Sequence, residues 1–144
     1  MSNKNNPVYS ILSYFTQICI DKKEVQCFTT DYEKRSRFFY NAKLKYPKIF
    51  KEIFFNTNGH IPYSKEIDDL LFDLKLCGLL VSVSPREKVY ILSQKLREKF
   101  PKTENKKREL KLKNIAENFY SELGCDENGK IGKHIKFNGL EKIV

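Results

Sequence analysis

The chain contains 144 residues, of which 40% are hydrophobic and 31% are charged, and it includes 11 Phe and 8 Tyr. This length suits one domain core, and this composition excludes a disordered chain. The apolar stretches are far shorter than the roughly 20 residues that a membrane-spanning helix needs. The polar N-terminus also differs from a signal peptide, so we expect a cytoplasmic protein that makes no contact with a membrane.

The formal net charge of the chain is +9. A positive surface raises the rate of association with nucleic acids and acidic surfaces, so the charge favours polyanionic partners. The excess is largest over residues 31–58, which carry seven Lys and Arg against three Asp and Glu.

The sequence contains four cysteines that lack any close pairing such as Cys-x-x-Cys: Cys19, Cys27, Cys77 and Cys125. We interpret them as reduced thiols of the core. The two histidines, His60 and His134, are far in sequence from any close cysteine pair, so no zinc site is expected. Neither histidine lies in a motif with a Ser or Cys nucleophile. We therefore predict a protein without enzymatic activity, metal or cofactor.

The first third of the chain predicts two helices. Asn6-Pro7 is typical of a helix start, and the apolar periodicity predicts a first helix that ends near Asp21. A connection or a short strand follows. Thr30 or Asp31 is then expected to cap a second helix that continues almost to Pro47.

The middle of the chain predicts a short helix, a capped helix and a β-hairpin. The short helix spans residues 48–55, and its apolar residues are expected to be buried: Ile49, Phe50, Ile53 and Phe54. Ser64 is expected to cap the next helix, which ends at Gly78 because glycine is preferred just past a helix C-terminus. Two segments rich in β-branched residues then predict a hairpin over about residues 79–92.

The last part predicts two further helices. Ser93 is expected to cap a short helix, and Pro101 separates that helix from a long amphipathic one over about residues 104–123. The long helix ends at Gly124. Its apolar stripe can be buried by packing on its own domain.

These elements predict a mainly α fold with a small β-hairpin (α+β). Residues 1–124 are expected to form a single domain. Residues 125–144 are expected to form a tail that is either weakly structured or packed on that domain.

The order helix, Gly-Leu-Leu, strand, tight turn, strand and Ser-capped helix resembles the second half of a winged-helix domain, a nucleic-acid-binding variant of helix-turn-helix. The resemblance covers about residues 48–100. It depends on these positions: Leu70-Leu71, Leu74, Leu76-Cys77-Gly78-Leu79-Leu80, Ser84 to Lys88, and Val89-Tyr90-Ile91-Leu92-Ser93. It implies that the helix over residues 64–77 enters the major groove with Lys65 and Lys75, while Arg86 and Lys88 of the wing contact phosphates. It also suggests a homodimer through the long helix over about residues 104–123, with packing of that helix on its own domain as an equally open alternative.

A basic and aromatic segment gives a second set of candidate contacts to a phosphate backbone. Its candidate residues are Arg35, Arg37, Lys43 and Lys45. Alternatively, the aromatic residues form the core and the cations form a solvated face. Both interpretations hold together if the solvated face also binds phosphates.

The helix over residues 64–77 also fits a protein partner. It carries four carboxylates against two lysines, and carboxylates are repelled by phosphates. Helical spacing places an apolar pair on the face opposite the core stripe, so the candidate partner-binding residues are Asp69, Phe72, Asp73 and Leu76. Burial of this pair within the monomer is an equally open alternative.

Net charge and resemblance slightly favour a non-enzymatic regulator that binds nucleic acid. The alternative is a protein-protein interaction adaptor or inhibitor built on the same winged-helix scaffold.

Overall fold

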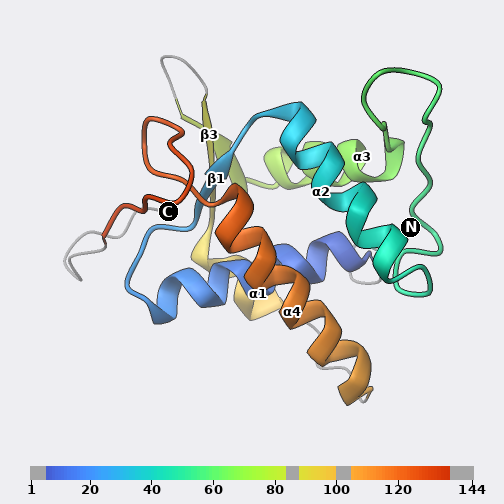
Figure 1. Cartoon of the computed structure of the whole chain (residues 1–144). Coiled ribbons are helices and arrows are strands. Elements are labelled where there is room, and N and C mark those ends of the chain that lie inside the picture. The colour runs from blue at the N-terminus through green and yellow to red at the C-terminus, as the bar shows by residue number, and fades with distance from the viewer. Residues whose placement is uncertain (1–5, 84–87, 100–104, 137–144) are drawn as a thin grey trace.

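The computed structural model describes residues 6–83, 88–99 and 105–136 and has an α+β fold, as the sequence predicts (Figure 1). Its α-helices are α1 (Pro7–Asp21), α2 (Tyr32–Lys45), α3 (Lys65–Leu76) and α4 (Lys106–Leu123). Its strands are β1 (Cys27–Thr29), β2 (Leu80–Ser82) and β3 (Val89–Leu92), and a 3₁₀ helix, η2, spans Gln94–Lys99. No helix among these described residues is long and apolar enough to cross a bilayer.

The helices begin at side chains that satisfy the first free backbone N–H groups. The Asn6 Oδ1 atom accepts from the Val8 N–H at 2.8 Å, and the Asp31 Oδ1 atom accepts from the Lys34 N–H at 3.1 Å. Ser64 caps α3 in the same way. Gly78 follows α3 with a φ of 75°, a left-handed conformation that favours glycine. The predicted boundaries of α1, α2 and α3 are therefore confirmed.

The three strands form one antiparallel sheet in the order β1-β3-β2. The predicted hairpin is confirmed, because Val81 of β2 pairs with Ile91 of β3. The other edge of β3 pairs with β1, where Cys27 lies opposite Ile91. The connection between the first two helices thus contains a strand, and β3 lies at the centre of the sheet.

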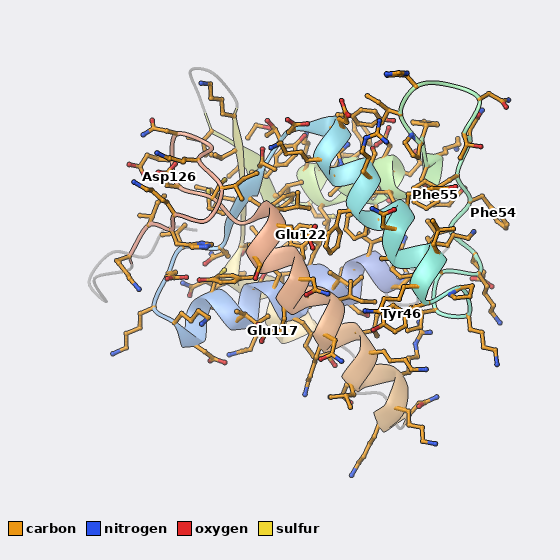
Figure 2. The ribbon with its side chains drawn as sticks, viewed as in Figure 1. Tyr46, Phe54, Phe55, Glu117, Glu122 and Asp126 are labelled. Carbon is orange, nitrogen blue, oxygen red and sulfur yellow. The ribbon has the colours of Figure 1, made fainter. Side chains whose placement is uncertain are left out.

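The predicted short helix over residues 48–55 is wrong, because the chain forms successive turns there. The Ile53 N–H donates to the Phe50 carbonyl three residues earlier, a turn bond that does not propagate a helix. Ile49, Phe50 and Ile53 are buried, but Phe54 is 64% exposed and points away from the body of the protein (Figure 2). So short a segment gains too little from three buried side chains to offset the cost of helix nucleation.

Aromatic side chains from four elements meet in the main core. The Phe119 ring of α4 lies 5.0 Å from Phe15 of α1, 5.2 Å from Phe28 of β1 and 5.5 Å from Phe38 of α2, measured between ring centroids. Figure 1 shows α4 lying across α1. The apolar stripe of α4 is buried inside this core: Leu112, Ile115, Ala116, Phe119 and Leu123. That stripe is therefore not available to a second copy of the chain.

The tail is packed against β1 as far as residue 136. Gly124 forms a bridge with Phe28, and the Val25 N–H donates to the Ile135 carbonyl at 2.8 Å. A second, smaller core forms beneath it from Val25, Cys27, Val89, Ile91 and Cys125. The tail thus covers the edge of β1 that β3 leaves open (Figure 1).

Candidate functional site

The outer face of α3 exposes two large apolar side chains. Its inner face, formed by Ile67, Leu70, Leu71 and Leu74, is buried in the main core. On the opposite side, Phe72 is 60% exposed and Leu76 is 71% exposed. Burial of this pair within the monomer is therefore excluded, and the two side chains form an apolar patch one helical turn long.

Carboxylates flank this apolar patch. Asp69 and Asp73 are exposed and lie on the same side of α3 as the apolar pair. Asp69 accepts a hydrogen bond at 3.0 Å from Lys65, one turn earlier. We define the α3 patch as Asp69, Phe72, Asp73 and Leu76.

Arg35 does not lie on the surface, and its assignment as a phosphate contact is wrong. The residue is 7% exposed because it shares the inward face of α2 with Phe38 and Phe39, three and four positions later. Its guanidinium lies 3.4 Å from the Asp68 carboxylate of α3 and over the Tyr32 ring. Arg35 thus joins α2 to α3 within the domain.

Other cations of α2 are engaged with neighbouring groups of the chain. Arg37 donates to Glu33 at 2.9 Å and to the His60 carbonyl at 3.2 Å. Lys43 donates to the Ile53 carbonyl, while Lys45 is exposed and lies over the Tyr46 ring. Phe38 and Phe39 are buried, so neither ring can stack on a nucleic-acid base.

The cations predicted on α3 have partners within the chain, whereas Lys88 of the wing is exposed. Lys65 is paired with Asp69, and Lys75 donates to the Tyr90 hydroxyl at 3.3 Å with its ammonium over that ring. Lys88 is exposed at the start of β3. Arg86 lies outside the described residues. The described cations thus do not gather on the outer face of α3.

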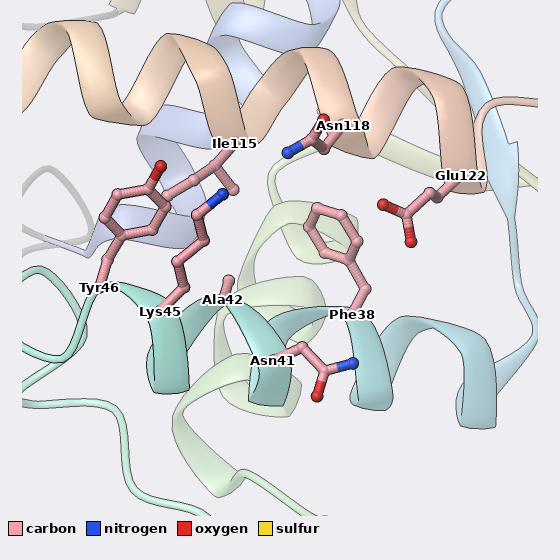
Figure 3. A pocket seen from close by; sticks show the side chains of 8 residues that line it. All are labelled: Phe38, Asn41, Ala42, Lys45, Tyr46, Ile115, Asn118 and Glu122. Carbon is pink, nitrogen blue, oxygen red and sulfur yellow. The ribbon is translucent and has the colours of Figure 1, made fainter.

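A cleft of about 180 Å³ lies between α2 and α4. Figure 3 shows Lys45 and Tyr46 at one end of it and Glu122 at the other. Its lining residues are Phe38, Asn41, Ala42, Lys45, Tyr46, Ile115, Asn118 and Glu122. The sequence did not predict this cleft, because its two walls come from helices about 75 residues apart in the chain.

A buried polar cluster, which we call the Glu24 cluster, anchors the tail. Glu24 is 8% exposed and accepts hydrogen bonds from the Tyr120 hydroxyl and, at 3.1 Å, from Lys136. The His134 ring stacks on Tyr120, with 4.3 Å between ring centroids, and its Nδ1 atom lies 3.8 Å from Glu24. The cluster joins residues before β1, on α4 and in the tail, and no sequence motif signals it.

The electrostatics of the Glu24 cluster favour a neutral His134 and an ionised Glu24. Burial lowers the pKa of His134, and nearby Lys136 and Lys22 lower it further against the opposing effect of Glu24. Burial pushes the pKa of Glu24 up, but the hydrogen bonds from Tyr120 and Lys136, together with the nearby positive charges of Lys136 and His134, hold it below its usual value.

Acid is expected to release the tail. Because both pKa values are lower in the folded state, the unfolded chain binds protons more tightly and stability falls as pH decreases. The loss begins as pH falls through 6.5, where the unfolded His134 titrates, and grows below 4.5, where the unfolded Glu24 titrates. The protection of the Val25 amide, which is its hydrogen-exchange rate divided into the intrinsic rate of an unprotected amide at the same pH, should fall over this range.

The variant His134→Gln is the matched control for this pH dependence. It should remove the loss of protection near pH 6.5 and keep the loss below pH 4.5. An equal loss of protection in both proteins near pH 6.5 would contradict a role of His134.

No protein-family model, curated protein or solved structure matches the chain.

Proposed function

We propose that this chain is a non-enzymatic, winged-helix-like interaction module that binds a protein partner through the α3 patch. The single observation that carries the proposal is the exposure of Phe72 and Leu76, 60% and 71%, on a helix whose other face is buried. Large apolar side chains side by side on a surface are typical of sites that a partner covers.

The winged-helix scaffold is supported by the way α3 leads into the hairpin of β2 and β3. Ser64 starts the helix, Gly78 ends it, and Leu80 of β2 lies opposite Leu92 of β3. This is the arrangement on which the sequence resemblance depends. A scaffold of this kind serves many functions, so the choice between them depends on the residues at the surface of α3.

The partner that fits the α3 patch is an amphipathic helix with an apolar stripe flanked by Lys or Arg. Phe72 and Leu76 would contact the stripe, because side chains four apart on a helix share one face. Asp69 and Asp73 would face the flanking cations, which is favourable across an interface rim. The α3 patch is thus locally acidic on a chain with a net charge of +9.

Nucleic acid is the second candidate, favoured by the net charge and by the exposed Lys88 beside the wing. In that mode α3 would lie against phosphates, yet its outer face offers Phe72, Leu76 and two carboxylates. Lys65, the cation of α3 on the same face, is paired with Asp69. Carboxylates near phosphates are repelled. The protein partner therefore agrees better with the surface of α3.

We further propose that the protein works in the cytosol. The sulfur atoms of its four cysteines are free thiols, the usual state in a reducing compartment.

The test is an NMR titration with three probes. One is a helical peptide with a Leu stripe and flanking Lys, the second replaces those Lys with Glu, and the third is a random DNA duplex at low salt. The Lys peptide should shift the amide signals of residues 65–76 and bind at least tenfold more tightly than the Glu peptide. Phe72→Ser or Leu76→Ser should weaken Lys-peptide binding about tenfold each.

Leu110→Ser is the matched control. Leu110 is 62% exposed on α4, outside the α3 patch, and the substitution also replaces an exposed apolar side chain with serine. It should leave peptide binding unchanged. Shifts at residues 65–76 caused by DNA rather than by the peptide would overturn the proposal in favour of nucleic acid. Equal binding of the two peptides would refute the role of the carboxylates.

A further inference from the structure

Cys27 and Cys125 face each other inside the smaller core. Their Sγ atoms lie 3.9 Å apart, and both residues are fully buried. The Cys125 N–H donates to the Cys27 carbonyl at 3.1 Å, next to the bridge between Phe28 and Gly124. The two cysteines are thus directly opposite across a short antiparallel ladder.

This placement suits a disulfide. Opposite residues in antiparallel strands have Cα atoms about 4.5–5.5 Å apart, which lies within the range of about 4.4–6.8 Å that disulfides use. Side-chain rotation would bring the sulfurs to bonding distance. The other cysteines are placed differently, because Cys19 belongs to the main core and Cys77 is exposed after α3. The prediction of a core position is thus wrong for Cys77.

We propose that Cys27 and Cys125 are a redox-active dithiol, and that its oxidation to a disulfide locks residues 125–136 against β1. The tail is otherwise held by non-covalent contacts: the Val25–Ile135 hydrogen bond, the Glu24 cluster and the bridge between Cys125 and Ile131. A covalent bond would make this attachment independent of those contacts.

The oxidant is a small-molecule disulfide such as oxidised glutathione. One cysteine thiolate attacks it, forms a mixed disulfide and releases one glutathione thiolate. The second cysteine then attacks the protein sulfur of that mixed disulfide and releases the second glutathione. The two cysteines lose two electrons and two protons, and the oxidant becomes two glutathione thiols. Such pairs in the cytosol are usually transient and redox-sensing.

Access to the pair requires the tail to open. The hydrogen bond with Cys125 and burial raise the pKa of the Cys27 thiol, so little of the reactive thiolate exists in the closed state. Oxidation therefore proceeds through a locally opened tail, and its rate reports how often the tail leaves β1.

The test uses the full chain with Cys77→Ser, which removes the exposed thiol that would join two copies. After incubation with oxidised glutathione, trypsin cleaves after Lys23, Lys34, Lys113 and Lys130. Mass spectrometry should find the peptide of residues 24–34 linked to that of residues 114–130. The oxidised protein should melt roughly 10 °C higher than the reduced protein, and its Val25 amide should exchange more slowly.

Cys19 lies on a separate tryptic peptide, so the masses of the linked peptides show which two cysteines form the disulfide. Adding Cys19→Ala should preserve the link, and adding Cys125→Ala should abolish it. A link between Cys19 and Cys27, or glutathione adducts without any link between Cys27 and Cys125, would overturn the proposal. The cross-link is measured in a chain that keeps both cysteines, so a folding defect in a variant cannot hide the result.

Discussion

Phe119→Ala is expected to lower the free energy of unfolding by about 3–5 kcal/mol. The Phe119 ring is fully buried and contacts aromatic rings of α1, β1 and α2: Phe15, Phe28, Phe38 and Phe39. Deleting it removes the apolar contact area and leaves a cavity that four large rings, held on different elements, cannot fill without moving the backbone. Domains of this size are stable by only about 5–15 kcal/mol, so the loss is a large share of the total.

Phe72→Ala is the matched control for this prediction, because it makes the same chemical change on a ring that is 60% exposed. We expect it to change the free energy of unfolding by less than about 0.5 kcal/mol. Urea denaturation followed by circular dichroism measures both variants. Similar losses in the two would contradict the placement of Phe119 at the centre of the core and of Phe72 on the surface.

Signals that act within a few residues predicted most of the helices and the hairpin. Asn6, Asp31 and Ser64 are capping residues whose function requires only the next three positions of the chain. Gly78 ends α3 for an equally local reason, its positive φ. Such features depend only on short stretches of sequence, so the ends of these helices could be predicted closely.

Features that depend on distant parts of the chain were missed or left open. The pairing of β1 with β3 joins Cys27 to Ile91, and the contact between Glu24 and Tyr120 joins residues 96 positions apart. Arg35 looked like a surface cation because the sequence does not show that Asp68 lies beside it in the fold. Long-range pairing depends on how the whole chain packs, and the residue pattern of a short segment does not reveal it.

The candidate site was predicted in part. Helical spacing placed Phe72 and Leu76 opposite the buried stripe of α3, and this is confirmed. Spacing alone could not decide whether another element covers that face, since this depends on where the rest of the chain lies. In the structure no described element covers this face, because Phe72 is 60% exposed and Leu76 is 71% exposed.

Gly124→Ala is expected to destabilise the protein by about 1–3 kcal/mol and to displace the tail. Gly124 has an ordinary backbone conformation, with φ −63° and ψ 140°, so alanine suffers no strain there. The obstacle is space, because a Cβ atom would lie 2.5 Å from the Tyr120 carbonyl oxygen and 2.6 Å from Cε1 of His134. The backbone carbonyl at the end of α4 cannot easily yield, so the His134 ring and the tail behind it must move.

The same substitution at another loop glycine separates this clash from a general effect of alanine. At Gly59 the nearest atom to an added Cβ, the Ile61 carbonyl oxygen, is 3.9 Å away, so Gly59→Ala should change stability by less than about 0.5 kcal/mol. In Gly124→Ala, the Val25 amide should exchange faster with solvent, because its acceptor, the Ile135 carbonyl, lies in the displaced tail. Unchanged exchange at Val25, together with equal stability of the two variants, would mean that the tail does not depend on the close approach of His134 to Gly124.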